Sequence, residues 1–142
     1  MTGVQTCALP IYRSGFIDWR VRSLGVIGSP GLEFDEAAAA ELAGRAYDRD
    51  HDRLAMVRQS LAVLASGDRT ARLRSLQVPA LVVHGASDRM VDVSGGRATA
   101  AAIPGAELVI FDGMGHSLPE PLWPKLADLI AGLVHRAEAA PA

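Results

Sequence analysis

The chain has 142 residues, of which 49% are hydrophobic and 21% are charged, and these are the proportions of an ordinary folded protein. Its net charge of −2 gives no general attraction to nucleic acid or to an anionic membrane, and no apolar run approaches the roughly 20 residues of a membrane span. We therefore expect no nucleic-acid partner, no membrane partner and a cytoplasmic location. The oligomeric state stays open.

The first segment, residues 1–11, reads MTGVQTCALPI and is similar to the in-frame translation of a sequencing-library adapter. We treat it as an artefact and leave it out of the fold reasoning, as one would a tag. It holds the only cysteine, Cys7, so the other residues have no thiol for a disulfide, a metal site or a nucleophile. Met1 is then no biological start, and we expect the chain to be a fragment of a longer protein.

Helices are predicted for the next part of the chain, residues 12–77. A short helix ends near Ile27, just before the turn-like sequence GSPG. Asp35 is a suitable N-cap for an alanine-rich helix over 36–48. Another helix is expected over 53–65, where apolar residues recur at spacings of three and four.

The pattern changes after residue 78, where two short apolar runs lie on either side of a helix. The runs, at 80–84 and 107–111, are typical of strands buried on both faces of a parallel sheet. With a helix over 94–103 between them, they form a right-handed βαβ unit.

The last helix has an apolar stripe at helical period from Leu122 to Val134. Residues 138–142 are expected to be a tail. Two strands do not make a stable parallel sheet alone, so the sheet is expected to be incomplete and to pair with a strand encoded upstream. The predicted class is α/β, with a helical part over 12–77 and a βαβα part over 78–137.

A polar residue follows each predicted strand: Asp88 in HGASDRMV and His116 in GMGHSLP. Because the carboxyl ends of parallel strands meet at one edge of a sheet, these two side chains are expected to lie close enough to pair. An aspartate beside a histidine is the orienting half of a nucleophilic triad, since the carboxylate fixes the ring tautomer and stabilises the imidazolium. We therefore predict that Asp88 and His116 are catalytic.

Other polar and apolar residues near this edge have alternative interpretations. Asp92 is the alternative acid, whereas Asp112 is explained by turn chemistry. His84, on the strand, is expected to be a core or pocket-wall residue. Met114 and Trp123 lie on either side of His116 in the sequence and either line an apolar pocket or pack in the core. No pattern implies a metal or an organic cofactor.

The segments VPALVVHGASDRMV (78–91), GGRATAAAIPGAEL (95–108) and GMGHSLP (113–119) resemble the C-terminal part of the α/β-hydrolase superfamily. The triad of that family comes in the order nucleophile, acid, histidine, so the resemblance implies that Asp88 is the acid and His116 the base. The preceding helices resemble the end of a helical cap and a re-entry helix near SGDRTARLRSL. The resemblance is nearest to bacterial aclacinomycin methylesterase-like hydrolases, which implies cleavage of a carboxylic ester.

The chain departs from the family pattern at Arg89, where many relatives have proline, and at Ser117, where many have aspartate. It also lacks a G-x-S-x-G elbow: the nearest imitations, around Ser29, Ser87 and Ser117, do not have the motif's spacing or its second glycine. The oxyanion-hole segment of the family is absent too. His116 therefore has an orienting acid but no serine to activate within this sequence.

The resulting hypothesis is a fragment of a serine hydrolase that cleaves a small-molecule carboxylic ester through an acyl-enzyme and is inactive as this chain alone. Two alternatives stay open. One is a non-enzymatic α/β-hydrolase-like protein that binds a small ligand, because a fold does not imply a function. The other is a dehalogenase or epoxide hydrolase with an aspartate nucleophile at an upstream elbow.

Overall fold

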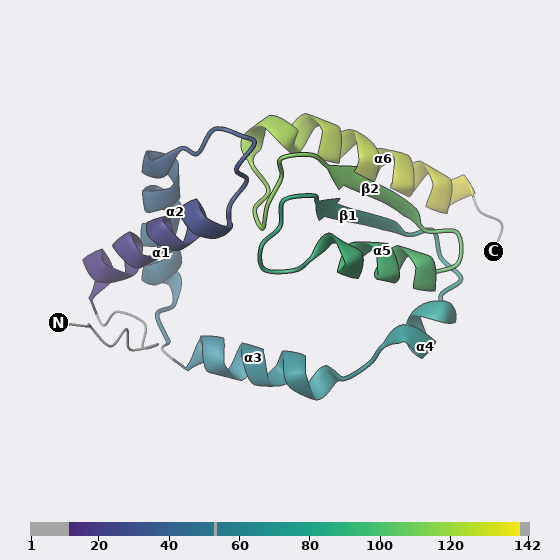
Figure 1. The fold of residues 1–142 in the computed structure, drawn as a ribbon, viewed down its shortest axis with the longest axis horizontal. Helices are drawn as coiled ribbons and strands as arrows, with labels where there is room; N and C mark the ends of the chain where they lie inside the picture. Colours follow the sequence, from purple (N-terminus) through teal and green to yellow (C-terminus); the bar gives the residue numbers. More distant parts are fainter. Residues whose placement is uncertain (1–11, 53, 140–142) are drawn as a thin grey trace. The chain divides into compact units, whose positions relative to one another are not determined.

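A computed structural model describes residues 12–52 and 54–139 of the chain (Figure 1). The adapter-like segment 1–11 and the last residues of the predicted tail lie outside the described residues. The described residues form two compact units. The helical unit comprises residues 12–24 and 35–67, and the sheet unit comprises residues 25–34 and 68–139.

Three helices start in the helical unit: α1 (Arg13–Ile27), α2 (Glu36–Arg49) and α3 (Ala55–Ser66). Asp35 caps α2 as predicted, because its carboxylate accepts a hydrogen bond from the Ala38 amide at 2.8 Å. The side chains of Arg13 and Asp48 form a bidentate ion pair between α1 and α2. The Arg13 Nε and Nη2 atoms lie 2.7 and 2.8 Å from the two carboxylate oxygens. The three predicted helices are therefore confirmed to within a few residues at their ends.

The sheet unit contains strands β1 (Leu81–Gly85) and β2 (Glu107–Phe111), which pair in parallel with Leu81 opposite Glu107 and Gly85 opposite Phe111. Helix α5 (Val93–Ala102) connects them and completes the predicted βαβ unit. The remaining elements are α4 (Thr70–Arg74), the 3-10 turn η1 (Glu120–Leu122) and α6 (Trp123–Ala139). Figure 1 shows α5 and α6 on opposite sides of the strand pair.

The strands are less buried than the sequence predicts. Every residue of β1 and β2 except Gly85 is half-buried, and no large side chain in the described part of the chain is fully buried. Strands of a parallel sheet are normally covered on both faces and flanked by further strands. The sheet of the described residues has only two strands, so it is partial. The strands stay half-buried because no further strands flank them there.

Two boundaries differ from the predicted ones. Helix α6 continues through Ala139, past the predicted start of the tail at residue 138, because alanine and glutamate favour helix there. Residues 25–34 pack with the sheet unit, although the sequence pattern assigned them to the helical part. Among the described residues, every helix is too short or too polar to cross a membrane.

Candidate active site

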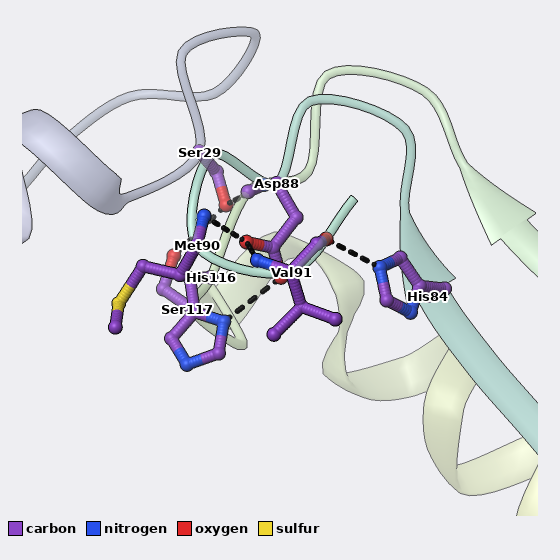
Figure 2. A network of polar contacts seen from close by, with 8 residues as sticks. Ser29, His84, Asp88, Met90, Val91, His116 and Ser117 are labelled. Atoms are coloured by element: carbon purple, nitrogen blue, oxygen red, sulfur yellow. Dashed lines mark hydrogen bonds and ion pairs between the residues drawn. The ribbon is translucent and has the colours of Figure 1, made fainter. Parts of the chain in front are cut away.

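The side chains of Asp88 and His116 meet at the carboxyl edge of the two strands, with Oδ2 of the aspartate 2.8 Å from Nδ1 of the histidine (Figure 2). Asp88 lies in the loop after β1, and His116 lies in the loop after β2. The structure therefore brings together the two residues that the sequence singles out. Their proximity was predicted because the carboxyl ends of parallel strands meet at one edge of a sheet.

The Asp88 carboxylate is held by its own loop. Its Oδ1 atom accepts hydrogen bonds from the amides of Met90, at 2.8 Å, and Val91, at 3.0 Å. The side chain is only 7% exposed. Burial by itself raises the pKa of Asp88, but the hydrogen bonds from Val91, His116 and Met90 outweigh burial and hold the pKa below its ordinary value. The carboxylate is therefore ionised and oriented at neutral pH.

The His116 ring is 42% exposed, far more than its partner. An ionised carboxylate only accepts hydrogen bonds, so Nδ1 of the ring keeps its proton and donates a hydrogen bond to Asp88. Within residues 12–52 and 54–139, the other ring nitrogen, Nε2, has no hydrogen-bond partner. Its lone pair is therefore available to accept a proton, as a general base requires.

The histidine loop, residues 112–117, lies tightly against the end of β1. The Ser87 amide donates to the Met114 carbonyl at 2.9 Å, and a methyl group on Gly85 would overlap that same carbonyl. Gly113 has a φ of +70°, in the left-handed region that favours glycine. The loop therefore depends on two glycines, one in the turn itself and one in the strand beneath it.

A segment far away in the sequence, Ile27–Gly31, contacts the other side of the histidine loop. The carbonyl of Ile27 accepts from the His116 amide at 2.8 Å, and Ser29 Oγ accepts from the Gly115 amide at 3.0 Å. The sequence reasoning missed this contact. Its only signal is GSPG, which predicts a turn but not what the turn touches.

A hollow of about 300 Å³ opens beside the pair. It is lined by Val83, His84, Gly85, Asp88, Met114, Gly115, His116, Ser117 and Leu118. His84 and Met114 thus take the pocket-wall positions that the sequence allowed for them. Trp123 is not part of this lining: its ring nitrogen donates to the Leu118 carbonyl at 2.9 Å, and the residue is 56% exposed.

The other candidates have structural roles. Asp92 is the N-cap of α5, where it accepts from the Ser94 amide at 2.9 Å, so it does not orient the histidine. His84 Nε2 lies 2.9 Å from the Val91 carbonyl, and this contact connects β1 to the loop that holds Asp88. In the part of the chain that the structure describes, no cluster of three or more histidine, cysteine or acidic residues could hold a metal ion.

The serines near the site make contacts other than with the His116 ring. The hydroxyls of Ser29 and Ser117 lie 2.9 Å apart and bond to each other. Ser87 contributes its amide to the Met114 carbonyl. No serine among the described residues is hydrogen-bonded to the His116 ring.

No model of a known protein family matches the sequence. A stretch of 52 residues is 40% identical to the non-heme chloroperoxidase CPO-A1 of Kitasatospora aureofaciens and covers 36% of this chain and 19% of that protein. The fold is similar to the crystal structure of the esterase RhEst1 from Rhodococcus sp. ECU1013, with a TM-score of 0.59 and 21% identity. That match covers 89% of this chain and 44% of the esterase.

The chain therefore has a partial α/β-hydrolase fold, and the predicted fold class is confirmed. The likeness to the chloroperoxidase and to the esterase supports a relationship to the α/β-hydrolase superfamily. The chain spans less than half of the length of the esterase, and its aligned stretch spans about a fifth of the chloroperoxidase.

Proposed function

We propose, from the α/β-hydrolase fold of the chain, that it belongs to a serine hydrolase in which His116 is the general base and Asp88 its orienting acid. The observation that carries the proposal is the 2.8 Å contact between Asp88 Oδ2 and His116 Nδ1, with Nε2 left open. A buried, ionised aspartate that fixes the tautomer of a more exposed histidine is the arrangement that serine activation needs.

The reaction follows from that arrangement. A serine hydroxyl attacks the ester carbonyl while Nε2 of His116 takes its proton, and Asp88 stabilises the imidazolium that results. The imidazolium then gives the proton to the departing alkoxide, which leaves as an alcohol. Water attacks the acyl-enzyme with the same base and releases the carboxylic acid and the serine.

The nucleophile is proposed to come from a part of the protein upstream of this chain. The 142 residues contain no G-x-S-x-G sequence, and the fold match covers less than half of the esterase. The chain alone is accordingly expected to show no ester turnover, because the proposal assigns both the serine and the oxyanion hole to that upstream part. The rest of the sheet would come from the same upstream part.

The proposed substrate is a small carboxylic ester, of the kind that aclacinomycin methylesterase-like hydrolases cleave. The support is the esterase match together with the hollow beside His116, where Val83, Met114 and Leu118 supply apolar lining. An apolar wall with a few polar groups is usual for small-molecule sites. The proposal includes no metal and no organic cofactor, and it places the enzyme in the cytoplasm.

The test begins by reading the source DNA upstream of the codon for Tyr12 and expressing the longer protein. Hydrolysis of p-nitrophenyl acetate and butyrate is then measured for the wild type, for His116→Ala and for His135→Ala, which changes an exposed histidine on α6. We expect His116→Ala to lower kcat by about 10⁴-fold or more and His135→Ala to leave it unchanged. Turnover that survives His116→Ala would overturn the proposal.

A further inference from the structure

We propose that the segment Ile27–Gly31 positions the general base by holding the backbone of the histidine loop, and that Ser29 is its central positioning residue. This inference rests on the proposed function, because it concerns how His116 of that site is held. It adds to the site a segment that lies outside both strand-end loops.

The first support is the pattern of hydrogen bonds. Gly31 donates its amide to the Gly113 carbonyl at 3.0 Å, and the His116 amide donates to the Ile27 carbonyl at 2.8 Å. Between these two bonds, Ser29 Oγ accepts from the Gly115 amide at 3.0 Å. The segment thus holds the loop at three backbone positions, the last of which is His116 itself.

The second support is the Ser29 side chain, which makes two contacts at once. Its hydroxyl accepts from the Gly115 amide and lies 2.9 Å from the Ser117 hydroxyl, so it holds the residues on both sides of His116 (Figure 2). One hydroxyl has one donor and two acceptor sites, which is enough for both bonds. Gly115 is buried, so water does not readily replace Ser29 as the acceptor for its amide.

The third support is the close approach of the two backbones. A methyl group on Gly31 would lie 2.5 Å from Cα of Gly113, and one on Gly115 would overlap the Gly28 carbonyl. Real Cβ atoms do not tolerate such contacts. The two stretches are therefore fitted to each other at glycines on both sides.

Two sets of contacts hold different parts of His116. Asp88 fixes the ring through Nδ1, and the segment fixes the main chain from which the ring projects. The ring is 42% exposed, so packing contributes little to its position. A shift of about 1 Å in a reacting group is enough to cost about 10²-fold in rate, so the backbone contacts bear directly on catalysis.

The experiment measures amide hydrogen exchange in the 142-residue chain and turnover in the longer protein. The variants are Ser29→Ala, Ser29→Thr, which keeps a hydroxyl, and the control Ser75→Ala, which removes a hydroxyl that bonds only the Arg72 carbonyl. We expect Ser29→Ala to speed exchange of the Gly115 and His116 amides about tenfold and to lower kcat with KM unchanged. Ser29→Thr should restore both, and Ser75→Ala should change neither.

Exchange of the Ala86 and Glu107 amides shows whether each variant still folds, because these amides donate across the strand pair to the Phe111 and Ala80 carbonyls, at 3.0 and 2.9 Å. If Ser29→Ala loses that protection, Ser117→Ala replaces it, since this variant removes only the hydroxyl contact and should give a smaller change in the same amides. Unchanged exchange at Gly115 and His116 in the folded variants would overturn the inference and leave the proposed function standing. Full turnover in His116→Ala would overturn the proposed function whatever the exchange data show.

Discussion

Asp88 and His116 share one hydrogen bond of 2.8 Å but differ sixfold in exposure, with side chains 7% and 42% accessible. The buried partner is the acid, and its second oxygen is held by two backbone amides. The more exposed partner is the proposed base, and its Nε2 atom has no hydrogen-bond partner among the described residues. This asymmetry supports the proposed roles, in which Asp88 orients the ring and His116 transfers the proton.

Asp88→Asn in the longer protein is expected to lower kcat by about 10³- to 10⁴-fold, because an amide no longer favours the ring tautomer with the proton on Nδ1. The matched control is Asp92→Asn, since asparagine also caps a helix and should leave both α5 and turnover intact. Steady-state hydrolysis of p-nitrophenyl acetate checks both. A large loss of activity in Asp92→Asn with full activity in Asp88→Asn would show that Asp92, and not Asp88, is the acid.

The stability of the sheet unit should depend on the ionisation of Asp88. Its pKa is lower in the folded chain than the ordinary value of about 3.9, so its carboxylate stabilises the fold above that value. This contribution is complete above about pH 5 and is lost as the pH falls through 4 toward the folded pKa. Urea unfolding should therefore show a difference between wild type and Asp88→Asn that shrinks from pH 5 to pH 3.

The control for that titration is Asp128→Asn, which removes an exposed carboxylate on α6. Its effect on the free energy of unfolding should be small at every pH. A difference between wild type and Asp88→Asn that stays constant over the same pH range would show that the native carboxylate is not held by these hydrogen bonds.

Two glycines close together in sequence should respond to alanine in opposite directions. Gly25 lies in α1 with nothing near the site of a Cβ, so Gly25→Ala should raise the free energy of unfolding by about 0.5–1 kcal/mol. Gly31 faces the backbone of Gly113, so Gly31→Ala should lower it by about 1–3 kcal/mol. Urea denaturation measures both, and an unaffected Gly31→Ala would mean that the segment does not stay on the histidine loop.

The pairing of Asp88 with His116 could be predicted because two simple rules act together. Short β-branched runs between loops indicate parallel strands, and the loops after such strands share one edge of the sheet. Each residue follows its strand closely, so uncertainty of one or two residues in the strand ends does not separate the side chains. The helix caps at Asp35 and Asp92 are similarly local, and only the first of them was predicted.

The contact of Ile27–Gly31 with the histidine loop could not be predicted from these patterns. It is made by backbone atoms and by glycines, which carry no periodic signal, and its partners are more than 80 residues apart in the chain. The partial burial of β1 and β2 was missed for a different reason: an apolar run shows that a strand can be buried, but not that covering elements are present.

We propose that His116 activates a serine that lies outside these 142 residues. The most direct measurement is labelling of the longer protein with a fluorophosphonate, which reacts with activated serines, followed by mass spectrometry of the labelled peptide. We predict one labelled serine upstream of Tyr12, with labelling abolished in His116→Ala and retained in His135→Ala. Labelling of Ser29, Ser87 or Ser117, or labelling that persists in His116→Ala, would contradict this role of His116.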